Sequence, residues 1–360
     1  EEAIGRGHRD FAVYVDPWIG TEKAARRRDF TMNAMLENVL SGEIIDHFGG
    51  RRDLEQGILR HVDDRSFGED PLRVLRAAQF AARFRCTIAP ETVALCRTID
   101  LSALSRERVE GELKKALLKS ETPSVFFTSL RAMNQLETWF PELCALIGVE
   151  QNPIYHPEGD VWIHTLQVLD AAAALRDRAE HPYWLLQSAL CHDLGKAVCT
   201  QRIDGVLHSY DHETEGLPLA RRQLNRLTNE TDLIKYVLNM VELHMKPNQL
   251  AAMQAKTKST NRMFDRSVCP GDLVLLAAAD ETGKDRGRED SSNQRFLRQR
   301  LDIYRERMSQ PMVTGKDLIA AGLPPDRHFS ELLAYARKLH LSGVDREEAL
   351  KATLAYARTK

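Results

Sequence analysis

The segment from Cys191 to Lys196, CHDLGK, gathers residue types that bind metal ions. The adjacent His192 and Asp193 offer an imidazole and a carboxylate, which the end of one helix can aim at a single ion with slight distortion. His164 fits as an earlier ligand from a separate helix, and Asp280 fits as a later one. This ligand set suits Mn²⁺, Fe²⁺, Ni²⁺, Co²⁺ or Mg²⁺ better than structural zinc. We expect a divalent transition metal or Mg²⁺ here, and such a metal lowers the pKa of a bound water and makes it a nucleophile.

Two further histidines, His212 and His244, fall between Asp193 and Asp280 in the sequence. They bind either a second metal ion or a substrate phosphate, and the sequence leaves both roles open. The resulting order, H…HD…H…H…D, resembles the HD phosphohydrolase superfamily. A histidine outside such an order is usually a core residue, and we interpret His181 and His340 in this way.

A basic cluster, Arg26 to Arg28, comes directly before a predicted helix over residues 29–36. Arginine side chains and the free N–H groups of a helix N-terminus both favour a bound triphosphate. Asp29 is expected to cap this helix, and Asn33 follows one turn later on the same face. The alternative is a basic loop before a capped helix, without a ligand.

A second cluster, EDPLRVLR, runs from Glu69 to Arg76. Pro71 suits the first turn of a helix, and Asp70 and Arg73 then share one face. Together they can present an acceptor and a forked donor to a base, a contact worth roughly 1–3 kcal/mol of discrimination. Arg76, one turn later, would reach the phosphates. The alternative is a helix stabilised by ion pairs of about 0.2–0.5 kcal/mol.

The two clusters together carry a family resemblance. RRDFTMNAM, GEIIDHFGGRRDLEQGILRHV and FGEDPLRVLRAAQFAARF closely resemble, in order and spacing, the bacterial class II tRNA nucleotidyltransferases. This class includes CCA-adding enzymes and poly(A) polymerases, and the resemblance continues through FFTSLRAMNQLETWFPEL to the C-terminus. It implies a cytoplasmic enzyme that adds or repairs the 3′-terminal CCA of tRNA from CTP and ATP.

The resemblance also assigns residues to the nucleotide. It implies that Asp70 and Arg73 form the template for the incoming base, that Arg28 and Asp29 lie at the triphosphate site, and that Arg76 adds a contact. A further arginine often follows in the family where this chain has Gln79, which puts a phosphate contact there in doubt.

The implied fold is mainly α: a remnant of an α/β nucleotidyltransferase head, then a helical neck, body and tail with an all-α HD domain, in a seahorse-like molecule. We assign residues 1–62 to the C-terminal part of the head, which includes a predicted strand at Phe11–Val15. The neck and body, which bind RNA and nucleotide, occupy 63–155, the HD phosphohydrolase domain 156–285, and the tRNA-binding tail 286–360.

The catalytic carboxylates of the family are not found in this sequence. In the family, a glycine-rich loop and a DxD pair that binds two Mg²⁺ ions lie upstream of the position of Glu1, and no DxD tripeptide occurs here. We therefore expect the chain to begin inside the head and to contain no catalytic residue for nucleotidyl transfer. Gly5 to Arg9, GRGHR, matches the flexible loop that helps the family switch from C to A addition.

Three functions stay open. The first is a CCA-adding enzyme with an HD hydrolase, because HD domains attached to this class resemble 2′,3′-cyclic phosphodiesterases, 2′-nucleotidases and phosphatases. The second is a poly(A) polymerase of the same family, which the complete HD ligand set disfavours. The third is a stand-alone HD phosphohydrolase whose head remnant binds nucleotide or RNA.

Composition sets the remaining limits. The 360 residues, 43% hydrophobic and 28% charged, are typical of a globular protein of two or more domains, and no apolar run suits a membrane span. Six scattered cysteines without a CxxC pair favour reduced thiols.

The net charge of −2 means that tRNA would have to bind at local basic patches. The candidates are Lys114, Lys115 and Lys119, and the arginines Arg295, Arg298, Arg300, Arg305 and Arg307.

Overall fold

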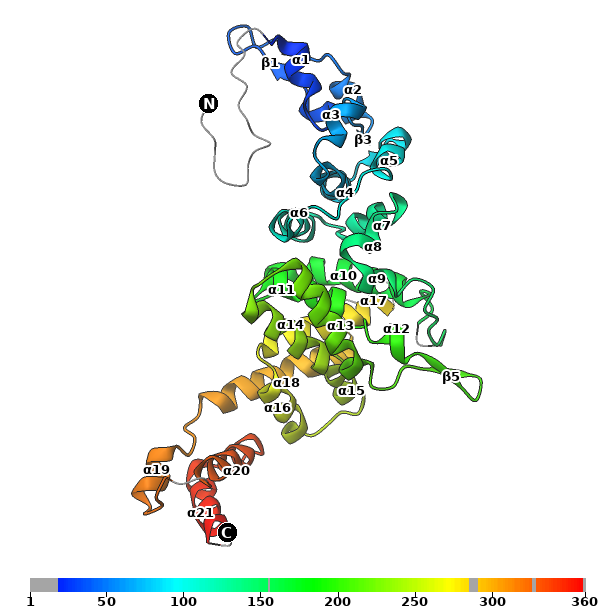
Figure 1. The fold of residues 1–360 in the computed structure, drawn as a ribbon. Helices are drawn as coiled ribbons and strands as arrows, with labels where there is room; N and C mark the ends of the chain where they lie inside the picture. Colours follow the sequence, from blue (N-terminus) through cyan, green and yellow to red (C-terminus); the bar gives the residue numbers. More distant parts are fainter. Residues whose placement is uncertain (1–18, 155, 285–290, 326–327, 359–360) are drawn as a thin grey trace. The chain divides into compact units, whose positions relative to one another are not determined.

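The computed structural model of the chain describes residues 19–154, 156–284, 291–325 and 328–358 (Figure 1). The fold is mainly helical, as predicted. Two compact units divide it, one of Glu1–Val149 with Arg221–Glu230 and one of Glu150–Ala220 with Thr231–Lys360. Within the described ranges, no helix combines the length and apolarity that a membrane crossing requires. The predicted strand at Phe11–Val15 and the GRGHR loop lie outside the described residues.

The first unit consists of short helices and paired two-residue strands. Its helices are α1 (Thr21–Arg26), η2 (Thr31–Asn33), α2 (Gly50–Glu55), α3 (Asp64–Gly68), α4 (Leu72–Phe84), α5 (Pro90–Cys96), α6 (Arg106–Lys119), α7 (Ser124–Ala132), α8 (Leu136–Trp139) and α9 (Pro141–Cys144). Strand β1 (Leu36–Glu37) pairs antiparallel with β2 (Ile44–Ile45), and β3 (Ile58–Leu59) pairs parallel with β4 (Thr87–Ile88). Helix α4 packs against α6 and α7.

The helix predicted just after the basic cluster is much shorter in the structure. The helix expected over residues 29–36 is only the single turn η2, because Leu36 turns into β1 and Phe30 forms a bridge with His61. Helix α7 ends at Ala132. Asn134 has a φ of 56°, a left-handed conformation that asparagine tolerates and that stops a helix. Pro90 is the first residue of α5, and Ser105 is the N-cap of α6.

The second unit is helical except for one hairpin. Its helices are α10 (Val161–Leu175), η3 (Arg176–Arg178), α11 (Pro182–Cys191), α12 (Lys196–Cys199), α13 (His212–Leu227, which ends in the first unit), α14 (Thr231–Leu243), α15 (Met245–Ala252), α16 (Thr257–Arg266), α17 (Pro270–Lys284), α18 (Ser292–Ser309), α19 (Gly315–Ala320), α20 (Phe329–Leu341) and α21 (Arg346–Ala357). The hairpin joins β5 (Gln201–Ile203) to β6 (Val206–His208).

Helices α10 and α17 form the centre of the second unit. Both are largely buried, and their packing is the most extensive helix pair in the described chain. Asp160 caps α10 by accepting a hydrogen bond from the Ile163 backbone N–H. The apolar run from Leu273 to Ala279 lies inside α17 and is buried. These two helices carry His164 and Asp280.

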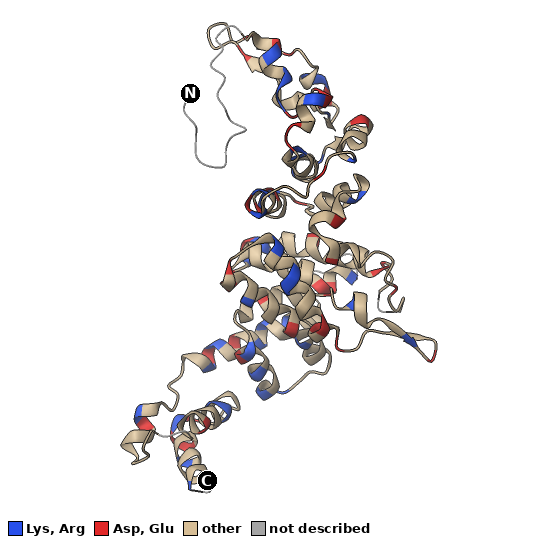
Figure 2. Ribbon diagram, in the orientation of Figure 1, with Lys and Arg blue, Asp and Glu red and all other residues tan. Residues whose placement is uncertain are grey.

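The predicted basic patches are largely balanced by neighbouring groups, and Figure 2 shows blue and red residues interspersed along most helices. On α6, Lys115 lies 2.8 Å from Glu112 and Lys114 lies 3.7 Å from Glu110. On α18, Arg300 donates to Thr257 and to the Ala255 carbonyl. Arg307 donates to the carbonyls of His340 and Val344. These two arginines therefore hold helices together.

Candidate functional site

His192 and Asp193 lie where α11 ends. The helix runs to Cys191, and His192 keeps helical backbone angles as its C-cap. The Nδ1 atom of His192 lies 2.8 Å from the carbonyl oxygen of Ala189, so this nitrogen carries a proton and donates it. The ring is thereby oriented with Nε2 toward Asp193, whose Oδ2 is 3.2 Å away.

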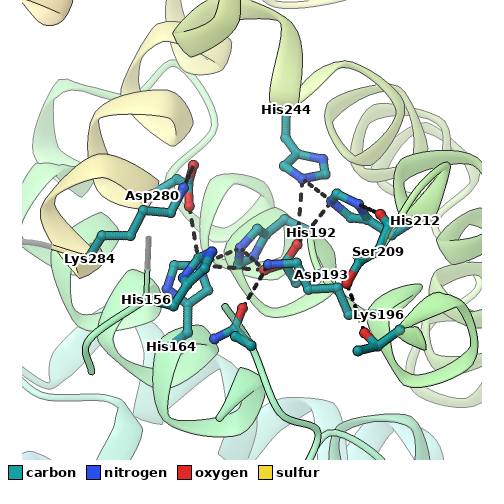
Figure 3. Close-up of polar contacts among 12 residues, drawn as sticks. His156, His164, His192, Asp193, Lys196, Ser209, His212, His244, Asp280 and Lys284 are labelled. Atoms are coloured by element: carbon teal, nitrogen blue, oxygen red, sulfur yellow. Dashed lines mark hydrogen bonds and ion pairs between the residues drawn. The ribbon is translucent and has the colours of Figure 1, made fainter. Parts of the chain in front are cut away.

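His164 and Asp280 meet this pair from α10 and α17 (Figure 3). The Nε2 atom of His164 lies 3.3 Å from Nε2 of His192 and 3.2 Å from Oδ1 of Asp280. Its Nδ1 lies 2.9 Å from Oε1 of Glu158. A carboxylate that receives the Nδ1 proton of a histidine orients the ring and raises the basicity of Nε2. The structure therefore brings together the four residues that the sequence selected.

His212 and His244 form a second histidine pair beside the same carboxylate. Their Nε2 atoms are 3.2 Å apart, and they lie 3.3 and 3.6 Å from Oδ1 of Asp193. Each Nδ1 lies 2.7 Å from a backbone carbonyl, that of Ser209 for His212 and that of Val241 for His244. Asp193 thus lies between two histidine pairs, with Oδ2 toward one pair and Oδ1 toward the other.

The facing nitrogens fit a metal ion. When each neutral ring keeps its proton on Nδ1, the Nε2 atoms carry lone pairs, and two lone pairs 3.2–3.3 Å apart repel. A cation between them removes this repulsion. Every member of the cluster is at most 4% exposed: His164, His192, Asp193, His212, His244 and Asp280. A buried set of imidazoles and carboxylates with aligned lone pairs is what a divalent metal requires.

The charges of the cluster are strongly coupled. Burial penalises the charge of Asp193, but His192 and Lys196 outweigh this effect and hold its pKa well below the ordinary value. Burial would lower the pKa of His164, but its hydrogen bonds to Asp280 and Glu158 raise it above the ordinary value. His212 also has a raised pKa, because Asp193 more than offsets its burial. Burial lowers the pKa of His244.

Sequence reasoning missed two groups at the centre. Glu158 orients His164, and it also lies 2.8 Å from Nδ1 of His156. Burial lowers the pKa of His156 to about 4, so its ring is neutral at pH 7. Glu158 precedes α10, which begins at Val161, so the period of that helix does not connect Glu158 with His164. Only the fold of the segment before α10 reveals the pair.

The glycine of the CHDLGK segment has a packing role. A Cβ atom on Gly195 would lie 2.0 Å from the carbonyl oxygen of His212 and 2.8 Å from the backbone nitrogen of Gly216. The backbone after Asp193 therefore touches the first turn of α13 directly. This contact positions His212 against Asp193.

The first unit joins the two sequence clusters through Asp29 and Arg76. Arg76 Nε and Nη2 lie 2.7 and 2.6 Å from Oδ2 of Asp29. The other oxygen, Oδ1, accepts from the Phe30 N–H at 2.8 Å and from Asn33 Nδ2 at 3.0 Å. Asp29 is therefore a buried acceptor that connects its own loop to α4, instead of the cap of a longer helix.

The predicted base readers are both engaged in the chain itself. Both oxygens of Asp70 lie 2.9 Å from Nη2 of Arg108, and Oδ1 also accepts from the Leu72 N–H at 3.0 Å. Arg73 donates to the carbonyls of Ser66 and Arg27, the latter at 2.8 Å. The Arg73 guanidinium thus connects α4 to the basic segment.

Two residues of the nucleotide clusters differ sharply in exposure. Arg28 is exposed and has no side-chain hydrogen bond or ion pair within the described part of the chain. Gln79 is 1% exposed, and its amide has no hydrogen-bonding partner among the described residues. Its burial argues against a contact between Gln79 and a phosphate at the surface of α4.

Comparison with known proteins decides the family. Residues 8–60 match the poly A polymerase head domain and residues 161–293 match the HD domain. The multifunctional CCA protein of Xylella fastidiosa (strain M23) is 38% identical over 303 residues, which cover 81% of this chain and 71% of that protein. The chain belongs to the multifunctional CCA protein family. The relative from Alkalilimnicola ehrlichii is 35% identical over 96% of this chain and 83% of its own length.

The match to another family member is shorter. The multifunctional CCA protein of Actinobacillus pleuropneumoniae serotype 5b (strain L20) is 40% identical over 71% of this chain, and the match spans 63% of that protein. Solved structures support the fold. An apo CCA-adding enzyme superposes with a TM-score of 0.64 at 20% identity, covering 94% of this chain and 73% of that one. The Thermotoga maritima CCA-adding enzyme complexed with tRNA superposes with a TM-score of 0.61 at 19% identity, covering 94% and 74%.

Proposed function

We propose that the second unit is a metal-dependent phosphohydrolase. The observation that carries the proposal is the position of Asp193 between two histidine pairs whose Nε2 lone pairs converge. His164, His192, Asp193 and Asp280 would hold one divalent ion, and His212 and His244 would hold a second ion with Asp193. Such ions activate water for attack and stabilise charge on a phosphoryl group.

The chain's own groups prepare this centre. Glu158 and the carbonyls of Ala189, Ser209 and Val241 keep each imidazole proton on Nδ1, so every Nε2 stays available as a ligand. Burial keeps bulk water from competing for the ligands. We propose a phosphoester at an RNA 3′ end, such as a 2′,3′-cyclic phosphate or a 2′-phosphate, as the substrate, because the head of the same chain belongs to a tRNA-processing family.

Metal analysis and hydrolysis assays on the purified chain test this proposal. We expect bound divalent metal, and metal-dependent hydrolysis of bis(p-nitrophenyl) phosphate and of 2′,3′-cyclic AMP. His192→Ala should lose both. His340→Ala is the matched control, because the His340 ring is buried and its Nε2 donates to the Arg307 carbonyl, in another part of the unit. Absence of bound metal from the wild-type chain under every loading condition would refute the proposal.

We also propose that the whole protein adds or repairs the CCA end of tRNA from CTP and ATP. Its relatives are named multifunctional CCA proteins, and similar folds were solved with ATP, CTP and tRNA. In this chain, Asp70 and Arg73 would read the base, and Arg28, Asp29, Asn33 and Arg76 would lie at the triphosphate. Asn33 and Arg76 both donate to Asp29, and Arg73 donates to the Arg27 carbonyl, so these contacts join the two sequence clusters and support a shared role.

The transfer step needs carboxylates that hold Mg²⁺, and the 360 residues contain no DxD tripeptide. We therefore propose that the residues of this chain select the nucleotide without joining it. Equilibrium binding should show that CTP and ATP bind, whereas labelled CTP or ATP should not be incorporated into tRNA lacking its CCA end. Robust Mg²⁺-dependent incorporation of labelled nucleotide by this chain would contradict the proposal that it does not join nucleotides. Incorporation of a run of A residues without C would support a poly(A) polymerase.

A further inference from the structure

The last turn of α17 places a lysine beside the candidate metal centre. Lys284 Nζ lies 2.8 Å from Oδ2 of Asp280, whereas Oδ1 of the same carboxylate lies 3.2 Å from Nε2 of His164 (Figure 3). Asp280 is buried, but the Lys284 side chain keeps 29% of its surface exposed. The carboxylate thus faces the metal ligands with one oxygen and the ammonium group of a partly exposed lysine with the other.

The backbone that carries Lys284 is fixed by close helix packing. A Cβ atom on Gly283 would lie 2.7 Å from Cγ2 of Val168 and 3.1 Å from its backbone nitrogen, so α17 and α10 touch there. Val168 follows His164 by one helical turn, and the two residues share a face of α10. The contact therefore sets the position of Lys284 relative to His164. Only the flexible four-carbon side chain can change its partner.

Lys196, the other lysine of the centre, is held differently. Its Nζ lies 2.7 Å from Oδ2 of Asp193 and 2.8 Å from Oε1 of Gln151, and its side chain is 10% exposed. Two partners and burial keep Lys196 in place. Among the described residues, Lys284 has a single hydrogen-bonding partner, Asp280, so it can leave with the loss of one contact.

We infer that Lys284 is a phosphate-binding residue of this centre, which leaves Asp280 when a divalent cation engages that carboxylate and then binds a phosphoryl oxygen of the substrate. The inference rests on the proposed hydrolase function. A cation at Asp280 neutralises the charge that holds the ammonium group and repels it as well. A negatively charged phosphoryl group between the cation and Lys284 is attracted by both positive charges. Of the two proposed substrates, the dianionic 2′-phosphate gains more from this pair of charges than the monoanionic 2′,3′-cyclic diester does. Both are expected to be hydrolysed, and the monoester is expected to bind more tightly.

Phosphate binding to the metal-loaded chain tests the inference without relying on turnover. The wild-type chain and its variants are loaded with Mn²⁺, their metal content is measured, and each is titrated calorimetrically with inorganic phosphate. Lys284→Met should keep the wild-type metal content and bind phosphate about tenfold more weakly or worse, because a charge-assisted hydrogen bond is lost. Lys284→Arg should retain most of the affinity. Lys235→Met, which removes an exposed lysine from an ion pair with Asp232, should change nothing.

The outcomes separate this inference from the proposed function. Phosphate affinity of Lys284→Met within twofold of the wild type would overturn the inference, and so would loss of metal from this variant, since Lys284 would then serve the metal site itself. A wild-type chain that binds phosphate through Lys284 but hydrolyses no phosphoester would refute the hydrolase alone. If Lys284→Met does not fold, Lys284→Gln, which keeps a neutral polar end, provides the same comparison.

Discussion

Arg108, in the first turn of α6, donates to both carboxylate oxygens of Asp70, each at 2.9 Å. Asp70 also accepts from the backbone N–H of Leu72, so donors fix it on two sides. A carboxylate that reads the edge of a base must keep one orientation. The position of α6 therefore decides how Asp70 is presented.

Arg108→Ala should reduce discrimination between CTP and UTP by about three- to tenfold, a part of what one base contact is worth. Equilibrium binding of CTP, ATP, UTP and GTP to the chain provides the measurement. Arg97→Ala is the control, since Arg97 is another arginine of this unit and its guanidinium donates, among the described residues, only to the Ala132 carbonyl. Unchanged discrimination in Arg108→Ala would show that Asp70 does not depend on this contact.

Gly195→Ala should disturb the second histidine pair. The new methyl group would lie 2.0 Å from the His212 carbonyl, so the first turn of α13 must move away and carry His212 with it. We expect a loss of about 1–3 kcal/mol in the free energy of unfolding, as for other overpacked sites. Metal content, measured by mass spectrometry, should fall as well.

Gly111→Ala is the matched control for this change. Gly111 lies inside α6, and a Cβ there would meet no atom within 4 Å. Alanine should therefore raise the free energy of unfolding by about 0.5–1 kcal/mol. A Gly195→Ala protein with wild-type stability and metal content would show that α13 does not depend on the close approach.

The sequence predicted the histidine cluster better than the groups that support it. The order of His164, His192 and His244 is a pattern along the chain, and the structure brings these residues together. Lys284 follows Asp280 by four residues on α17, a local pair that helical spacing could have indicated. Glu158 could not be assigned, because its contact with His164 depends on how the segment before α10 packs. Tertiary contacts of this kind leave no period in the sequence.

In the first unit, by contrast, a local sequence pattern predicted an element that the structure does not form. Helical spacing over residues 29–36 predicted a helix, but the pairing of Leu36 with Ile45 and the bridge between Phe30 and His61 outweigh that local preference. Asp29 was predicted as a helix cap. Its actual partner, Arg76, lies 47 residues away and could be found only from the fold.

The position of Asp193 predicts how metal content responds to single substitutions. Because its two oxygens face the two histidine pairs, Asp193→Ala should remove both ions of a two-metal centre. His164→Ala and His244→Ala should each remove one. Mass spectrometry of the metal content of the purified chains measures this directly. If the wild-type chain holds a single ion and His244→Ala retains it, His212 and His244 would be assigned to substrate phosphate instead.

Metal binding should stabilise the protein more at pH 8 than at pH 6. The raised pKa values of His164 and His212 mean that, without metal, their protonated forms stabilise the fold below about pH 6.5. That stabilisation is lost as the pH rises through the raised values. A metal ion needs unprotonated Nε2 atoms, so its affinity rises over the same range. The increase in Tm on adding Mn²⁺, measured by differential scanning fluorimetry, should therefore grow from pH 6 to pH 8.

The matched variant for this pH dependence is Asp193→Ala, which lacks the shared carboxylate and should show no Mn²⁺-dependent increase in Tm at either pH. An equal increase in the wild-type protein at both pH values would mean that no histidine proton competes with the metal.

The ion pair between Asp29 and Arg76 should contribute to both stability and nucleotide affinity. Asp29 is 7% exposed, and Arg76→Met leaves its carboxylate buried with only two neutral donors, from Phe30 and Asn33. Loss of a partner for a buried polar group costs about 1–3 kcal/mol. The urea midpoint of the first unit should fall accordingly. The double variant Asp29→Asn with Arg76→Met should recover part of this loss, because the buried charge is then gone.

The same pair connects α4 to the loop that carries Arg28, so its loss should weaken the binding of CTP and ATP by similar factors. This uniform effect differs from that of Arg108→Ala, which should change the preference among bases. The contrast follows from what each arginine holds: Arg76 holds the loop beside the triphosphate site, and Arg108 holds the carboxylate that reads the base. If Arg76→Met changed base preference and left overall affinity intact, the assignment of Asp29 and Arg76 to the triphosphate would be wrong.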